Sequence, residues 1–248
     1  MQKKVAIILP NYNSSEFIKK TLDSILSQSY KNWKLYLVDD CSNLKTVKFL
    51  KKIKNKKIKI YFLKKNKGAG FCRNLAINKS KSHYLAFIDS DDVWHKDKLK
   101  LQINFMEKNK HNFTYSYYKT YNYKTKKTKK IITPDNFNFN NFIKNTSIAT
   151  SSMIITRSST KNIKFINSKV CEDFYYKCLL LKKNINAYCI KKYLMNYSIR
   201  ENSLQSKKIR NLLWIWNINK NYNKFSIFKN LYSIFFISLN SLKKYGFK

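Results

Sequence analysis

The chain has 248 residues, which is long enough to bury the core of one domain with a small appendage. A hydrophobic content of 44% and an aromatic content of 16% exclude a wholly disordered chain, and no apolar stretch is as long as a membrane-spanning helix requires. The 51 Lys and Arg against 13 Asp and Glu give a formal net charge of +38, which favours anionic partners.

The basic residues are nearly all lysines, with dense runs at 45–67 and 124–130. We interpret these runs as solvated helix faces and a loop, not as a nucleic-acid site, because no helix-turn-helix, zinc-finger or RNA-recognition signature accompanies them. The five cysteines are odd in number and form no C-x-x-C pair, so neither a disulfide framework nor a structural zinc site is expected. The first residues lead into a strand pattern instead of a signal peptide, and a cytoplasmic protein is therefore expected.

Strands and helices alternate in the first part of the chain. Strand-like apolar runs occupy 5–9, 33–38, 58–63 and 84–88, and helical patterns follow each of the first three runs. Ser14 or Ser15 is a candidate cap for the first of these helices. This order is typical of a Rossmann-like α/β fold with a mostly parallel, doubly wound sheet.

The later part of the chain continues with a helix expected at 94–106, strands at 113–123 and 148–156, a helix at 173–181 and a strand at 187–190. Turn character is expected at 197–206. From residue 209 on, apolar and aromatic residues recur at helical spacing among lysines. We predict a catalytic domain at 1–208 and an amphipathic helical extension at 209–248, which either packs on the core or lies on an anionic membrane surface.

Two of the predicted strands end in acidic residues. Asp39 and Asp40 follow one strand, and Asp89, Asp91 and Asp92 follow another. In an open α/β sheet, ligands bind just past the carboxyl ends of the strands. Carboxylates so close together repel one another, and a hard divalent ion that shares its shell with phosphate oxygens would hold them. A solvated turn or a helix cap is the alternative interpretation of each acidic pair.

Several motifs in order along the chain resemble the family 2 glycosyltransferases, which have the GT-A fold. The resemblance covers about residues 3–205 and is carried by 9–13, 22–33, 38–42, 66–68, 73–74, 87–94 and 172–173. The segments 113–115, 151–152 and 197–203 look most like bacterial enzymes that elongate O-antigen and related glycans on polyprenyl-diphosphate carriers.

The resemblance implies a set of donor-binding residues. Asp40 would accept a hydrogen bond from the base, and Gly68 and Arg73 would lie near the base and the diphosphate. Asp91 would bind a metal, Mn²⁺ or Mg²⁺, with Asp89 beside it towards ribose or metal in a D-x-D motif. The full set of nucleotide-sugar-binding residues is Pro10, Tyr12, Asn13, Asp40, Gly68, Arg73, Asp89 and Ser90.

The resemblance also implies that Asp173 is the general base, which deprotonates the acceptor hydroxyl for a single inverting displacement. Without the family pattern, Asp173 would be interpreted as a first-turn carboxylate favoured by the helix dipole. Arg200 would either stabilise the diphosphate or lie on the surface. Some relatives use a histidine late in the chain as a further metal ligand, and this chain departs from them because its last histidine is His111.

The function expected from these residues is transfer of a hexose, glucose or galactose, from a UDP-sugar to a hydroxyl of a lipid-linked saccharide in cell-surface polysaccharide synthesis. The enzyme would be peripheral on the inner face of the cytoplasmic membrane. A sugar-nucleotide pyrophosphorylase is one alternative, but 10–13 lacks its glycine-rich phosphate loop. A non-catalytic basic protein that binds polyanions is another, and the intact carboxylates argue against it.

Overall fold

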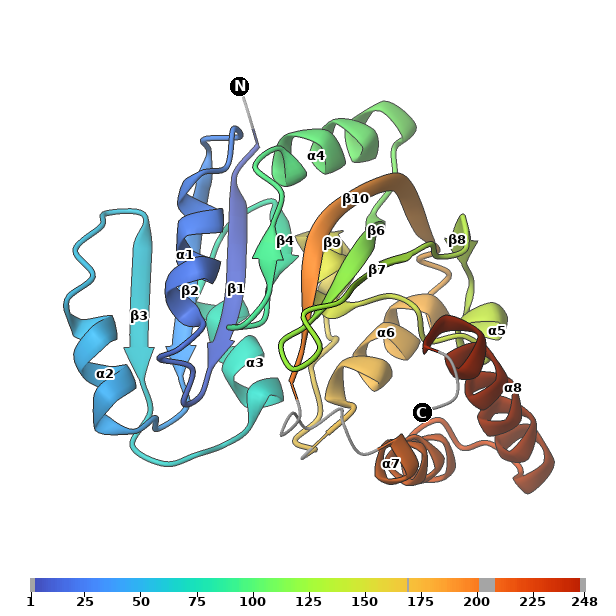
Figure 1. Ribbon diagram of the computed structural model, residues 1–248. Helices are drawn as coiled ribbons and strands as arrows, with labels where there is room; N and C mark the ends of the chain where they lie inside the picture. Colours follow the sequence, from blue (N-terminus) through green and yellow to red (C-terminus); the bar gives the residue numbers. More distant parts are fainter. Residues whose placement is uncertain (1–2, 169, 201–207, 246–248) are drawn as a thin grey trace.

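The structure, a computed structural model, describes residues 3–168, 170–200 and 208–245 (Figure 1). Its first part alternates strands and helices as the apolar pattern predicts. The elements are β1 (Val5–Asn11), α1 (Ile18–Leu26), β2 (Trp33–Asp39), α2 (Leu44–Lys51), β3 (Ile58–Phe62), α3 (Ala69–Lys79) and β4 (Tyr84–Phe87). These four strands are parallel and adjacent in the order β3-β2-β1-β4.

The second part extends this sheet with mixed strand directions. Its elements are β5 (Val93–Trp94), α4 (Lys98–Asn109), β6 (Phe113–Asn122), β7 (Thr128–Ile131), β8 (Asn136–Phe137), α5 (Phe139–Phe142), the 3₁₀ turn η1 (Thr150–Ser152), β9 (Ile154–Thr156), the 3₁₀ turn η2 (Arg157–Thr160), α6 (Glu172–Lys182), β10 (Ala187–Ile199), α7 (Lys208–Asn221) and α8 (Ile227–Tyr245). The sheet continues from β4 as β9-β6-β10-β5, in which β9 is antiparallel to both neighbours and β10 is parallel to β6.

Helices cover both faces of the sheet, which confirms the expected doubly wound α/β fold (Figure 1). Buried residues of α1, α2 and α4, such as Leu22, Leu50 and Ile103, form the core of one face. Cys72 of α3 and Tyr176 of α6 belong to the core of the other face, which the helices α5, α7 and α8 also join. The strands between the two cores are apolar on both sides, as a doubly covered sheet requires.

Three local predictions were wrong. The helix expected at 94–106 begins only at Lys98, because Val93 and Trp94 pair with β10 as a short strand. The strand expected at 148–156 is reduced to β9, because the amide of Ser152 bonds to the carbonyl of Ala149 and closes the turn η1. The strand expected at 187–190 runs on to Ile199 through two register shifts, so turn character at 197–206 is wrong for 197–199. Residues 201–207 of that segment lie outside the described residues.

The cap expected at Ser14 or Ser15 takes a different form. The helix α1 begins at Ile18, and no side chain caps it. The carbonyl of Ser14 accepts the amides of Phe17 and Ile18, so the backbone of this residue closes the first turn.

The two C-terminal helices form a pair beside α5 and α6 (Figure 1). Ile215 and Ile218 of α7 and Ile237 of α8 are buried in the core that α6 shares. The division of the chain at 208/209 stays a prediction, although α7 begins at Lys208. Among residues 3–168, 170–200 and 208–245, no helix combines the length and the apolar character that crossing a bilayer requires.

Candidate active site

The carboxyl ends of β1, β2 and β4 meet at one edge of the sheet, because the three strands are parallel and adjacent. Asn11 at the end of β1 lies opposite Asp39 in the register and donates its side-chain amide to the Asp39 carboxylate at 2.7 Å. Asp39 also accepts the hydroxyl of Ser42 at 2.6 Å and is buried. This residue therefore fixes the loop after β2 and offers little surface to a ligand.

Asp40 holds the loop that precedes α3. Its two carboxylate oxygens accept the backbone amides of Lys67 at 2.7 Å and Gly68 at 2.8 Å. Gly68 has a φ of +85°, in the left-handed region that glycine adopts without strain. Each carboxylate oxygen has two lone pairs and so keeps acceptor capacity, but Asp40 is buried; its expected bond to a nucleobase stays a prediction.

The other residues expected near the nucleotide surround this loop. Pro10 is buried within β1, and the ring of Tyr12 is exposed beyond the strand. Asn13 accepts the amide of Asn43 at 2.7 Å and so ties the loop after β1 to the start of α2. The carbonyl of Ser90 accepts the hydroxyl of Thr21 at 3.1 Å. Among these four, Tyr12 and Asn13 present the exposed side chains.

The carboxyl ends of β1, β2 and β4 form the edge at which the donor is expected to bind, here called the donor edge. Arg73 joins this donor edge to the start of α6. Its guanidinium is buried between two carboxylates, at 2.7 Å from Asp89 Oδ1 and 2.5 Å from Glu172 Oε1. Burial and the neighbouring Asp173 raise the pKa of Glu172, while Arg73 opposes that rise. The sequence predicted Arg73 near the diphosphate, and the structure places it behind Asp89 as a link between two parts of the site.

The turn after β4 concentrates negative charge. Asp91 Oδ2 lies 2.6 Å from a guanidinium nitrogen of Arg200, and burial with the neighbouring Asp89 keeps the pKa of Asp91 raised. Asp92 is buried and accepts the amide of Ser198 at 2.9 Å, and burial followed by repulsion from Asp91 and Asp89 raises its pKa well above the usual range. The turn is thus a crowded set of acids with too little compensating charge.

These carboxylates fit a divalent cation only in part. Asp89 and Asp91 present oxygen ligands of the kind that Mn²⁺ and Mg²⁺ prefer, and the raised pKa of Asp91 marks charge that a cation would neutralise. Within the described ranges, no group of three His, Cys, Asp or Glu residues is arranged to enclose a metal. The chain would therefore supply one or two ligands and leave the remaining positions to phosphate oxygens and water.

Asp173 lies in the first turn of α6, and its pKa is shifted in the opposite direction from those of Asp91 and Asp92. Its Oδ2 accepts the hydroxyl of Thr150 at 2.6 Å and the ammonium of Lys177 at 2.6 Å. Burial would raise the pKa of this carboxyl, but the charge and hydrogen bond of Lys177, with the hydrogen bond of Thr150, hold it well below the usual range. Both of these hydrogen bonds engage Oδ2 of the carboxylate.

The turn η1 connects the two groups of carboxylates. Thr150 bonds to Asp173, and the next residue, Ser151, accepts the backbone amide of Asp89 at 3.0 Å. Lys177 completes the link, since its buried ammonium also reaches the carbonyl of Ile148 at 2.8 Å. The sequence analysis assigned no role to Lys177. The spacing of Asp173 and Lys177, four residues apart on one helix, was the signal that could have found it.

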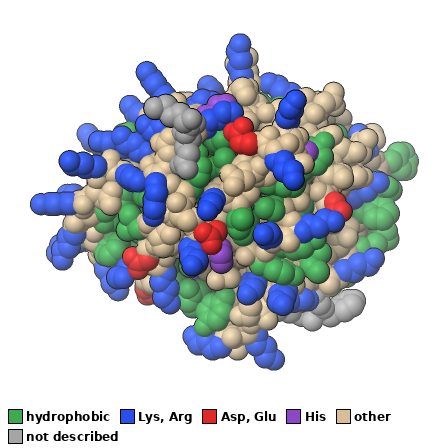
Figure 2. Space-filling view, turned by 90° about the horizontal axis from the view of Figure 1, so that it is seen from above, with side chains coloured by type: hydrophobic (Ala, Val, Ile, Leu, Met, Phe, Trp, Pro, Cys, Tyr) green, Lys and Arg blue, Asp and Glu red, His purple; other side chains and the backbone are tan. Residues whose placement is uncertain are grey.

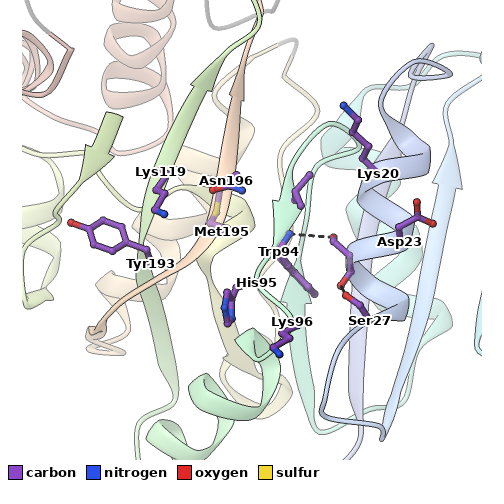
Figure 3. A pocket seen from close by; sticks show the side chains of 12 residues that line it. Lys20, Asp23, Ser27, Trp94, His95, Lys96, Lys119, Tyr193, Met195 and Asn196 are labelled. Carbon is purple, nitrogen blue, oxygen red and sulfur yellow. Dashed lines mark hydrogen bonds between the residues drawn. The ribbon is translucent and has the colours of Figure 1, made fainter. Parts of the chain in front are cut away.

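A pocket of about 710 Å³ lies between α1, β5 and β10 (Figure 3). It is open, and side chains of α1, β5 and β10 surround it, including Lys20, His95 and Asn196. The backbone amide of Trp94 donates to the hydroxyl of Ser24 across its floor at 3.2 Å. None of the predicted site residues lines this pocket, so the candidate site is the strand edge and not this hollow.

Comparisons with known proteins identify the family of this chain. The family model described as glycosyl transferase family 2 matches residues 6–172. A putative teichuronic acid biosynthesis glycosyltransferase of Bacillus subtilis, TuaG, is 31% identical over 97% of this chain and 96% of its own length. The Escherichia coli UDP-Glc:alpha-D-GlcNAc-diphosphoundecaprenol beta-1,3-glucosyltransferase WfaP is 33% identical over 98% of this chain and 96% of its own.

Among solved structures, TarS of S. aureus, determined in complex with UDP-GlcNAc, superimposes with a TM-score of 0.72. The alignment covers 97% of this chain and 73% of that one, at 21% sequence identity, and it supports the GT-A fold. These matches leave no place for the pyrophosphorylase or the non-catalytic alternative. The chain belongs to family 2 of the glycosyltransferases.

Proposed function

We propose that this glycosyltransferase moves a hexose, glucose or galactose, from a UDP-sugar to a hydroxyl of a lipid-linked saccharide, with inversion at the anomeric carbon. The observation that carries the proposal is the ionised Asp173 carboxylate, held by Lys177 and Thr150 and joined through η1 and Arg73 to the acidic turn. A base and a donor edge fixed to one another are what a single in-line displacement needs.

In the proposed reaction, the Asp173 carboxylate takes the proton of the acceptor hydroxyl as the hydroxyl oxygen bonds to the anomeric carbon. The bond from the anomeric carbon to the diphosphate breaks in the same step, and its electron pair leaves with the nucleotide. Asp91, with Asp89 beside it, would hold a Mn²⁺ or Mg²⁺ ion, which supplies Lewis-acid neutralisation of the departing diphosphate. Tyr12, Asn13 and Asp40 would bind the nucleoside.

The choice of donor and acceptor is supported by what the relatives' names state. WfaP is named for transfer from UDP-Glc to a GlcNAc-diphosphoundecaprenol, and TarS was solved with UDP-GlcNAc. TuaG is named for synthesis of teichuronic acid. We therefore place this chain in cell-surface polysaccharide synthesis, acting at the inner face of the cytoplasmic membrane on an acceptor anchored there.

The test is transfer from a panel of UDP-sugars to synthetic GlcNAc- and GalNAc-diphosphate-lipids in the presence of Mn²⁺, Mg²⁺ or EDTA. We expect one UDP-hexose to be transferred in a metal-dependent reaction that Asp173→Asn slows by roughly 10²–10⁴-fold. Asp23→Asn, which changes an exposed carboxylate paired with Lys19, is the matched control and should transfer at the normal rate. Failure of every UDP-sugar to bind, measured calorimetrically with Mn²⁺, would overturn the donor assignment.

A further inference from the structure

The inward face of α8 packs on the rest of the chain through Ile234 and Ile237 and through several polar side chains that form hydrogen bonds. Ser233 donates its hydroxyl to the carbonyl of Ile143 at 2.6 Å, and Asn240 donates to the carbonyl of Lys144 at 3.0 Å. Asn230 is buried and donates to the carbonyl of Trp216 in α7 at 3.0 Å. A helix that packs through hydrogen bonds fixes its orientation about its own axis, so its opposite face is equally well defined.

The opposite face of α8 carries large apolar side chains in solvent. Phe228 is 84% exposed, Leu231 53% and Phe235 58%. Tyr232 and Leu239 are also exposed, and the five residues recur at steps of three and four, which places them on one stripe. Ring contacts of Phe235 and Tyr232 with Phe236 make the stripe continuous. We call these five residues, Phe228, Leu231, Tyr232, Phe235 and Leu239, the α8 stripe.

The charge around the α8 stripe selects its partner. No Asp or Glu occurs after Glu201, whereas Lys220, Lys224 and Lys243 are exposed on or beside the two C-terminal helices. A second copy of a chain with a net charge of +38 would be repelled, and an anionic lipid surface would be attracted. Figure 2 shows, for the face seen from above, how Lys and Arg side chains are spread over the surface with few Asp and Glu among them.

We propose that the α8 stripe is a docking surface for a bilayer that contains anionic lipids, with α8 lying in the plane of the interface. Aromatic and aliphatic side chains would enter the headgroup boundary while the exposed lysines contact lipid phosphates. The proposal deepens the proposed function, since it rests on an acceptor carried by lipid. The helix is bonded to Ile143 and Lys144, in the segment that leads to Thr150 and the base, so docking would bring that side of the site towards the membrane.

The test is flotation of the full chain with vesicles of phosphatidylcholine alone and of phosphatidylcholine with phosphatidylglycerol. We expect binding to the anionic vesicles, and a loss of at least about tenfold in the doubly substituted Phe228→Ser/Phe235→Ser chain. Ile132→Ser, which removes an apolar side chain that is 70% exposed near the end of β7, is the matched control and should bind as the unaltered chain does.

A second variant, Phe235→Trp, keeps the aromatic character of the α8 stripe and adds a fluorescent reporter. In Phe235→Trp, brominated lipids in anionic vesicles should quench more fluorescence than they quench in the unaltered chain. Vesicle binding that survives the double substitution would overturn the proposal. A second result would also overturn it: the unaltered chain binds no vesicles and is a dimer by light scattering, and the double substitution dissociates that dimer. The α8 stripe would then bind a second copy of the chain.

Transfer to a water-soluble acceptor separates this proposal from the proposed function. A GlcNAc-diphosphate with a short alkyl chain needs no membrane, so the doubly substituted chain should glycosylate it at the normal rate. Normal transfer together with unchanged vesicle binding would contradict only the docking surface. Absence of transfer in the unaltered chain, with vesicle binding intact, would contradict only the proposed function.

Discussion

The two groups of carboxylates in this site differ in how their charge is balanced. At the turn after β4, burial and mutual repulsion raise the pKa values of Asp91 and Asp92. At the start of α6, Lys177 and Thr150 outweigh burial and hold the pKa of Asp173 low. The chain thus supplies the proposed base with its own cation, Lys177, while the acidic turn at the proposed donor edge has more carboxylates than cationic partners.

The two groups of carboxylates also differ in how firmly their cationic partners are held. The Arg200 side chain that contacts Asp91 is about one-third exposed and lies over the ring of Phe17, so a cation bound at Asp91 would compete with it for this carboxylate. Lys177 is buried and bonded three times, so it stays beside Asp173. The following substitutions test whether a cation replaces Arg200 at the donor edge while Lys177 remains beside the proposed base.

The largest effect is expected from Asp173→Asn, which keeps the shape of the base and removes its charge. Transfer should fall by roughly 10²–10⁴-fold, the usual contribution of general-base catalysis. Affinity for UDP in the presence of Mn²⁺, measured by calorimetry, should stay within a factor of about two, because the donor edge is untouched. Transfer at an unchanged rate would show that a residue other than Asp173 is the general base.

Asp91→Asn should produce the next largest effect. Loss of one carboxylate from the acidic turn should weaken binding of the metal. Its Lewis-acid contribution of several kcal/mol corresponds to a rate loss of roughly 10²–10³-fold. Unlike Asp173→Asn, this substitution should also weaken UDP binding in the presence of Mn²⁺. The unaltered chain in EDTA should behave similarly, and equal UDP affinity with and without metal would contradict the assignment of Asp91.

Lys177→Met should shift the pH profile rather than abolish transfer. Without the ammonium, burial dominates and the pKa of Asp173 rises, so the base becomes protonated at a higher pH. The acid limb of kcat should therefore move to higher pH, with about a tenfold loss per pH unit below the new limb and near-normal transfer above it. Lys177→Arg keeps the charge and should restore the limb; a limb that does not move in Lys177→Met would show that Lys177 is only structural.

Gly70→Ala should have the smallest effect, on stability. A Cβ at Gly70 would lie 2.6 Å from the carbonyl oxygen of Ile166, where the segment before α6 approaches α3. We expect the free energy of unfolding to fall by about 1–3 kcal/mol, as for other overpacked positions, measured by chemical denaturation. Asn78→Ala, at an exposed position of the same helix, should change it by less than about 0.5 kcal/mol.

The sequence predicted the donor edge better than the base. Asp40, Asp89 and Asp91 could be placed together because they end strands of a parallel sheet, and the register brings such ends to one edge. Asp173 was chosen only through the family resemblance, since a first-turn acid has an ordinary explanation. Its partner Thr150 lies in a turn that was expected to be a strand, because hydroxyl-rich apolar runs suit both structures.

Arg73 illustrates what the pattern could not specify. Its position in the sequence indicates the donor site, but its two carboxylate partners come from the turn after β4 and from α6, which are far apart along the chain. Pairing between distant elements depends on how the sheet and helices pack, and one sequence contains no direct signal for it. The same reason explains why the contact between Arg200 and Asp91 was missed.

The anomeric configuration of the product tests the proposed single displacement most directly. A single displacement with Asp173 as the base converts an α-linked UDP-hexose into a β-linked product. The measurement is proton NMR of the anomeric signal after transfer from the active UDP-hexose to GlcNAc-diphosphate-lipid with Mn²⁺. A β-linked sugar is the predicted result. An α-linked sugar would contradict the account, because it requires retention and a role for Asp173 other than that of the base.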